Sequence, residues 1–225
     1  MPPATSMAAL APAPLPTRHL LYLHGFRSSP QSTKARQVRA WLARHRSDVE
    51  WWCPQLPPSP AEAMALLWQR IKAWPAEHSA VIGSSLGGFY ATAVAERTGR
   101  SGRTGRTGGS GWRAVLLNPA VSPARDLEKY IGEISAWHGP ERFFFEPRFI
   151  DELRAITASR LTCPDRYFAI IAKGDEVLNW VEMSARYRGC AIRLLEGGDH
   201  SLSDFELHLP DVMGFRGLDS RTTSE

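Results

Sequence analysis

The sequence lacks any apolar run that approaches the ~18 consecutive residues of a membrane span, so a membrane-spanning protein is not expected. Its first residues also lack the basic stretch with which a secretory signal begins. Prolines interrupt the apolar part of this stretch, so no signal peptide is predicted. We expect residues 1–17 to form a disordered tail and the protein to be cytoplasmic.

Cysteine is scarce and shows no paired spacing. The three cysteines, Cys53, Cys163 and Cys190, lie far apart and are odd in number. This pattern differs from both a disulfide framework and a metal-binding motif. Reduced structural thiols are the expected state, in keeping with a cytoplasmic protein. The sequence therefore predicts neither a metal site nor a cofactor.

Acidic residues are absent from the stretch that accounts for the net charge of +4. No Asp or Glu lies between Glu96 and Arg113, whereas five arginines do lie in this stretch, at positions 97, 100, 103, 106 and 113. Because Gly, Ser and Thr separate them, residues 99–111 are predicted to form a flexible Arg/Gly loop. Such a loop could bind a polyanion, but no aromatic side chain is interleaved on which a base could stack. We favour a solvated insertion and expect no nucleic-acid partner.

Short apolar runs alternate with helical patterns along the chain. A length of 225 residues suits one domain, expected at residues 18–217, with a polar tail at 218–225. Six strands are predicted, at residues 19–23, 49–54, 80–82, 112–117, 166–172 and 191–195. Helices are predicted at residues 32–46, 60–74, 86–97, 178–188 and 202–215. This alternation indicates the α/β class, with a mostly parallel sheet covered by helices on both faces.

Residues 122–164 are more than a simple crossover between two strands requires. They carry helical signals and five aromatic side chains: Trp137, Phe143, Phe144, Phe145 and Phe149. We interpret the segment as a lid over the site. Each aromatic residue taken singly is typical of an ordinary core, whereas the run Phe143–Phe145 fits one amphipathic face badly. A wall that binds an acyl group is the alternative interpretation of that run.

The third predicted strand ends in Gly83-x-Ser85-x-Gly87, and an alanine-rich helical pattern follows. This is the pattern of a nucleophile elbow, a tight strand-to-helix turn that exposes one serine above the sheet. The neighbouring Ser84 is excluded, because Ile82 and Leu86 would then occupy the glycine positions. The α/β-hydrolase fold is the one in which this turn is typical.

A serine nucleophile needs a base, and the base needs an acidic partner that fixes its tautomer. Hydrolases of this fold have the chain order Ser, acid, His, and Ser85, Asp175 and His200 follow that order just after predicted strands. His24 is the less suitable base because it adjoins the loop that forms the oxyanion hole. Glu176 and Asp199 are weaker candidates for the acid, although a helix N-cap is the alternative role of Asp175.

The tetrahedral intermediate carries a negative charge that backbone N–H groups can stabilise. We predict that Leu86, at the start of the helix after the elbow, supplies one donor. The second donor is predicted to be Phe26, in the loop after the first strand.

The chain also resembles the small bacterial YqiA-type esterases of the α/β-hydrolase superfamily. The resemblance extends over residues 20–215 and depends on six motifs: Leu21-Tyr22-Leu23-His24-Gly25-Phe26-x-Ser28-Ser29-Pro30, Pro57-Pro58, Gly83-Ser84-Ser85-Leu86-Gly87-Gly88, Asn118-Pro119-Ala120, Gly174-Asp175-Glu176-Val177-Leu178 and Glu196-Gly197-Gly198-x-His200. It implies hydrolysis of carboxylic esters, acyl-CoA thioesters included, with Ser85 as nucleophile, Asp175 as acid and His200 as base. The Arg/Gly loop is a departure from the family pattern, which leaves a phosphate-binding role for it open.

The sequence thus predicts a metal-free serine esterase that acts on a small-molecule ester or thioester through an acyl-enzyme. Two alternatives stay open. An acyltransferase would use the same triad with an alcohol or amine in place of water. A non-catalytic interaction protein would retain the hydrolase fold without needing the triad. The oligomeric state and the physiological ester do not follow from the sequence.

Overall fold

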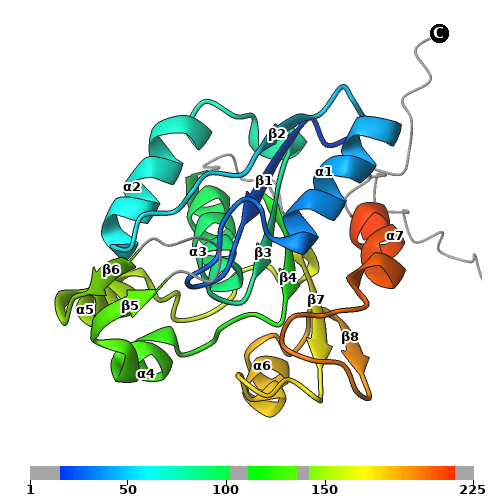
Figure 1. The fold of residues 1–225 in the computed structure, drawn as a ribbon. Coiled ribbons are helices and arrows are strands. Elements are labelled where there is room, and N and C mark those ends of the chain that lie inside the picture. The colour runs from blue at the N-terminus through cyan, green and yellow to red at the C-terminus, as the bar shows by residue number, and fades with distance from the viewer. Residues whose placement is uncertain (1–15, 102–110, 136–141, 216–225) are drawn as a thin grey trace, which may run out of the picture.

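A computed structural model describes residues 16–101, 111–135 and 142–215 of the chain (Figure 1). Almost all of the tail expected at residues 1–17, most of the Arg/Gly loop expected at 99–111, and the tail expected at 218–225 lie outside the described residues. The described helices include none with the length and apolar character needed to cross a membrane.

The centre of the fold is a six-stranded sheet with the order β2-β1-β3-β4-β7-β8, and every pairing in it is parallel. The strands are β1 (His19–Leu23), β2 (Glu50–Trp52), β3 (Ser79–Ser84), β4 (Arg113–Leu117), β7 (Tyr167–Ala172) and β8 (Ala191–Leu195). This confirms the predicted α/β class and strand number. Because all six strands run the same way, their carboxyl ends lie along one edge of the sheet, where ligands bind in such folds.

Helices cover both faces of the sheet, as Figure 1 shows. One face is covered by α1 (Thr33–His45) and α7 (Phe205–Phe215), and the other by α2 (Pro60–Ile71), α3 (Leu86–Ser101) and α6 (Trp180–Arg186). Alternate strand side chains supply the two cores, so Leu20 and Tyr22 pack on one face and Leu21 and Leu23 on the other. Burial of both faces explains why the inner strands are almost continuously apolar.

The predicted lid, residues 122–164, contains a hairpin that the sequence did not reveal. The segment contains α4 (Pro123–Leu127), β5 (Gly132–Ser135), β6 (Arg142–Phe145) and α5 (Arg148–Ile156). The hairpin consists of β5 and β6, which pair antiparallel. Phe144 is 59% exposed and Phe145 is buried, which is the alternation of a half-buried strand. Three identical residues in a row concealed that alternation. The remaining short turns are the 3-10 helices η1 (Ala76–His78), η2 (Glu128–Tyr130) and η3 (Pro164–Arg166).

The helix after the elbow extends to Ser101, whereas the sequence predicted its end near Arg97 and a loop from residue 99. Arg166 packs beside this last part of the helix. Its guanidinium donates to the carbonyl of Ala95 over 2.6 Å and packs on Gly99, where a Cβ would lie 2.6 Å from Arg166 Nη2. Gly99 therefore gives the arginine room beside the helix instead of ending it.

Candidate active site

Ser85 occupies a strained turn between β3 and α3. Its φ of 55° lies in the left-handed region, which L residues seldom adopt outside such turns. The turn is close to its neighbours: a Cβ at Gly83 would lie 2.2 Å from the carbonyl oxygen of Gly87, and one at Gly87 would lie 2.0 Å from that of Leu23. Only glycine fits at either position. The two glycines of the motif thus allow the backbone to turn sharply against β1 and project Ser85.

Three side chains from different strand ends meet beside this turn. His200 Nε2 lies 3.0 Å from Ser85 Oγ, and His200 Nδ1 lies 2.8 Å from Asp175 Oδ2. Because a carboxylate only accepts, His200 Nδ1 carries the proton and donates to Asp175. Nε2 is then free to accept the hydrogen bond of the Ser85 hydroxyl. The Asp175 side chain is fully buried, while the imidazole of His200 is 19% exposed.

Asp175 also organises the turn that follows β7. Its Oδ1 accepts hydrogen bonds from the backbone N–H groups of Val177 and Leu178, both at 2.8 Å. The capping role considered for Asp175 and the contact with His200 therefore coexist, one on each carboxylate oxygen. The helix that follows, α6, has its own N-cap in Asn179. Since both oxygens are engaged, the carboxylate has one fixed orientation toward His200.

Four further residues position the loop that carries His200, and this role was not predicted from the sequence for any of them. Asn118 donates to the carbonyls of Asp199 and His200, at 2.9 and 3.2 Å, and accepts from the N–H of Ala172 at 2.8 Å. Glu176 accepts from the His200 N–H at 3.0 Å, and Lys34 Nζ donates to the Ser201 carbonyl at 2.5 Å. A Cβ at Gly174 would lie 2.2 Å from Gly198 O, so glycine there lets the two loops touch.

His24 lies in the loop after β1 and serves as a structural bridge. Its Nδ1 donates to the carbonyl of Gly25 over 3.0 Å, and its Nε2 accepts from the N–H of Leu56 over 3.2 Å. Both nitrogens are thus engaged in the neutral form of the ring, and the residue is only 3% exposed. This joins the β1–α1 loop to the β2–α2 loop and agrees with the preference for His200 as the base.

Burial of His24 predicts a specific loss of stability in acid. Desolvation lowers the pKa of His24 below its ordinary value, so below about pH 6.5 the unfolded chain binds a proton that the folded chain excludes. The unfolded state then carries more protons, and the free energy of unfolding falls as the pH falls toward the lowered folded pKa. We expect His24→Asn to be less stable than wild type at neutral pH but to lose less stability on acidification.

Urea denaturation at about pH 7.5 and about pH 5.5 would measure this difference. His45→Asn is the matched control, because His45 is exposed on α1 and should leave the acid-induced loss unchanged. An acid-induced loss that is equally large in His24→Asn and wild type would contradict the assignment.

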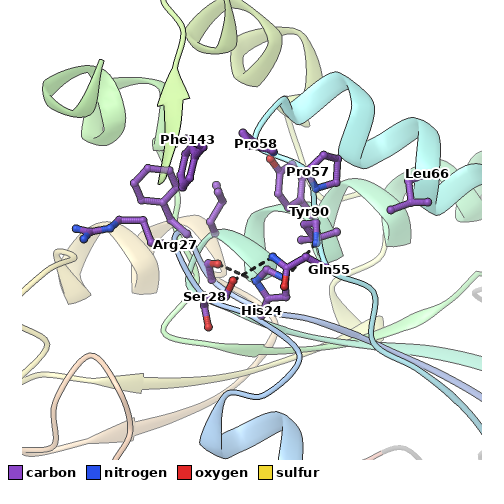
Figure 2. A pocket seen from close by; sticks show the side chains of 13 residues that line it. His24, Arg27, Ser28, Gln55, Pro57, Pro58, Leu66, Tyr90 and Phe143 are labelled. Carbon is purple, nitrogen blue, oxygen red and sulfur yellow. Dashed lines mark hydrogen bonds between the residues drawn. The ribbon is translucent and has the colours of Figure 1, made fainter. Parts of the chain in front are cut away.

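Figure 2 shows a cavity of about 510 Å³ whose wall includes His24, Tyr90 and Phe143. Its wall includes Gly25, where an added Cβ would lie 3.2 Å from Ser85 Cβ and 3.6 Å from Ser85 Oγ. Phe26 and Leu86, the two predicted oxyanion donors, also line it. No backbone hydrogen bond in the described turns and loops uses the N–H of Phe26 or Leu86. Both amides therefore keep their donor capacity at the wall of the cavity.

The aromatic run of the lid segment divides among three environments. Phe143 lines the cavity, Phe144 is exposed and Phe145 is buried in the core. The idea that all three form one acyl-binding wall is therefore wrong for Phe144 and Phe145. Phe143 and Phe145 both pack edge-on against Phe26, at ring-centroid distances of 6.2 and 5.4 Å. The lid segment thus supports the loop that carries one of the predicted oxyanion donors.

The described residues contain no group of three or more His, Cys, Asp or Glu side chains arranged to hold a metal ion. Cys53, Cys163 and Cys190 are all free in the structure. Burial raises the pKa of the Cys53 thiol to about 12, which keeps this thiol protonated and unreactive at neutral pH.

Comparison with known proteins gives two results. The model of a family described as "Uncharacterised protein family (UPF0227)" matches residues 19–217.

Among solved structures, the monoacylglycerol lipase of Paleococcus ferrophilus is 15% identical, with a TM-score of 0.63 over 91% of this chain and 96% of that one. Est1E of Butyrivibrio proteoclasticus with bound ferulic acid is 14% identical, with a TM-score of 0.59 over 89% and 87%. RedJ, a thioesterase of Streptomyces coelicolor, is 17% identical, with a TM-score of 0.53 over 93% and 96%. At these identities the likeness establishes the α/β-hydrolase fold.

Proposed function

The chain belongs to the UPF0227 family, which is the YqiA-like family that its motifs indicated. We propose that it is a serine hydrolase of carboxylic esters. The observation that carries the proposal is the continuous hydrogen-bonded series from Ser85 through His200 to Asp175. A cavity whose wall includes Gly25 and Leu86, the neighbours of Ser85, adjoins it. The esterase, lipase and thioesterase named above give analogous support at the level of the fold.

In the first step Ser85 Oγ attacks the ester carbonyl while its proton moves to His200 Nε2. The imidazolium that forms is stabilised by the buried carboxylate of Asp175. When the tetrahedral intermediate collapses, the bond to the leaving oxygen breaks, and the proton on Nε2 passes to that oxygen. The products of this half-reaction are a free alcohol and an acyl group on Ser85. A thioester would react in the same way and release a thiol.

The carbonyl oxygen becomes negatively charged during the attack. The N–H groups of Phe26 and Leu86 are the donors we assign to it, because both line the cavity beside Ser85 and neither is engaged in the described turns. Leu86 is the first residue of α3, so the positive end of the helix dipole adds to this stabilisation. Each such donor contributes about 10²–10³ to the rate in enzymes of this kind.

Water completes the cycle. His200 Nε2, neutral again after the alcohol has left, accepts a proton from a water molecule as its oxygen attacks the acyl carbonyl. Collapse of the second intermediate returns the proton to Ser85 Oγ and releases the carboxylic acid. The residues that carry out both halves are therefore Ser85, His200 and Asp175, with Asn118 and Glu176 as positioning residues for the His200 loop.

Product analysis tests this function against its two alternatives. With p-nitrophenyl acetate in buffer that contains a primary alcohol, we expect free acetate as the main product and an acetyl group on Ser85 in quenched samples. A predominance of the transferred acetyl ester would replace the hydrolase by an acyltransferase. Complete absence of both p-nitrophenol release and Ser85 acetylation, across esters and thioesters, would favour a non-catalytic protein.

A further inference from the structure

Tyr90 is a buried residue at the cavity wall, and its hydroxyl has no hydrogen-bond partner among the described residues. Tyr90 lies on α3 and is 2% exposed, and its ring lines the cavity with Pro57 and Phe143, as Figure 2 shows. Within the described part of the chain, its hydroxyl forms no hydrogen bond. Among the described residues it is not one of the fully enclosed side-chain atoms that lack a partner, so it is reached from the cavity. A ligand that fills the cavity without offering a hydrogen bond would leave this hydroxyl buried and unpaired, which is unfavourable.

The surroundings of Tyr90 keep this hydroxyl in its donor form. Burial and the nearby carboxylate of Glu152 both raise the pKa of Tyr90 well above its ordinary value. Glu152 itself is held by hydrogen bonds from Ser59 Oγ at 2.7 Å and from the N–H of Ala61 at 3.0 Å. A group that offers an oxygen as hydrogen-bond acceptor would therefore satisfy the donor of Tyr90.

The cavity lies on the side of Ser85 that suits the acyl part of the ester. The leaving oxygen must approach His200 Nε2 to receive its proton, so the leaving group extends on the His200 side. The residues that line the cavity include Phe26 and Leu86 and include neither Ser85 nor His200. The wall adjoins Ser85 at Gly25, where an added Cβ would lie 3.6 Å from Ser85 Oγ. With the carbonyl oxygen directed at the Phe26 and Leu86 amides, the acyl chain is the part that enters the cavity.

The separation of Leu86 and Tyr90 along α3 determines how deep in the cavity the Tyr90 hydroxyl would contact an acyl chain. Tyr90 follows Leu86 by four residues on the same helix, a rise of about 6 Å and one turn, so both residues face the cavity. Its side chain therefore reaches the acyl chain several bonds beyond the reacting carbonyl. The cavity wall also includes the apolar side chains of Leu56, Leu66 and Phe143.

We propose that the cavity binds the acyl group and that Tyr90 selects acyl groups carrying a hydroxyl or oxo oxygen at the depth of its own hydroxyl. This inference rests on the proposed function and assigns its substrate class: oxygenated acyl esters, preferred over plain acyl esters of the same length. Such a site discriminates well, because a plain chain leaves the Tyr90 hydroxyl buried and unpaired.

A position scan tests the proposal. The substrates are p-nitrophenyl esters with one hydroxyl moved carbon by carbon along the acyl chain, each compared with the unsubstituted ester of the same length. Wild type is expected to prefer the hydroxylated ester at one or two neighbouring positions by roughly tenfold in kcat/KM. In Tyr90→Phe this ratio is expected to fall to about one, mainly through KM.

Tyr22→Phe is the matched control, because Tyr22 is equally buried but packs in the opposite core, away from the cavity. It should keep the wild-type ratio. Equal rates on hydroxylated and plain esters in wild type, or a preference that persists in Tyr90→Phe, would overturn the Tyr90 assignment while leaving the esterase intact. Hydrolysis that persists in Ser85→Ala would instead overturn the proposed function.

Discussion

Replacement of Ser85 with alanine is expected to lower kcat for p-nitrophenyl acetate by about 10⁴–10⁶-fold, to the level set by the remaining binding and oxyanion groups. The variant removes the oxygen that lies 3.0 Å from His200 Nε2 and nothing else. Alanine also keeps a Cβ at a φ of 55°, so the strain of the turn is unchanged and the thermal midpoint should stay near that of wild type. Steady-state turnover and a thermal melt of the same sample measure both effects.

Ser84 provides a close control, because it precedes Ser85 in the chain but is buried at the end of β3. Ser84→Ala should retain wild-type turnover within a few-fold and should still react with a fluorophosphonate probe, whereas Ser85→Ala should not be labelled. Undiminished turnover in folded Ser85→Ala, or labelling lost in Ser84→Ala alone, would refute the assignment of the nucleophile.

The meeting of the three candidate side chains could be predicted because the fold brings strand ends together. Ser85, Asp175 and His200 each follow a short apolar run, and parallel pairing carries such positions to one edge of the sheet whatever their separation in sequence. Glycines marked the close approaches: Gly83 and Gly87 at the elbow, and Gly174 between the loops of β7 and β8. Strand periodicity and glycine positions are local features, so they can be recognised in a single sequence.

The contacts that fix the orientation of His200 depend on long-range geometry and gave no such signal. Lys34, at the start of α1, meets the carbonyl of Ser201, 167 positions later in the chain. Burial lowers the pKa of this lysine to about 8, an effect that no spacing reveals. Asn118 stands out in the sequence only as part of the motif Asn118-Pro119-Ala120. In the structure its φ is 41°, and three hydrogen bonds of its side chain connect β7 with the His200 loop.

Conversion of Asp175 to asparagine is expected to lower kcat/KM by about 10⁴-fold with little loss of stability. The reason lies in the two oxygens of Asp175. Oδ1 accepts from the N–H groups of Val177 and Leu178, so the oxygen of the asparagine amide will take that position and its NH₂ group will face His200. An NH₂ group donates, so His200 Nδ1 must accept and the ring proton moves to Nε2. Nε2 can then no longer accept the proton of Ser85.

The neighbouring Asp199 separates this tautomer effect from a general loss of charge near the site. Its carboxylate accepts hydrogen bonds from the N–H and hydroxyl of Ser203, at 3.0 and 2.6 Å, which lower its pKa. Asp199→Asn removes the same charge one residue from His200 without changing the partner of its Nδ1, so kcat/KM should fall only a few-fold. Equal losses in the two variants would make charge the cause. If the changed tautomer of His200 is the cause, the loss of kcat/KM must be specific to Asp175→Asn. It must also persist across the pH range, because raising the pH cannot restore an acceptor at Nε2.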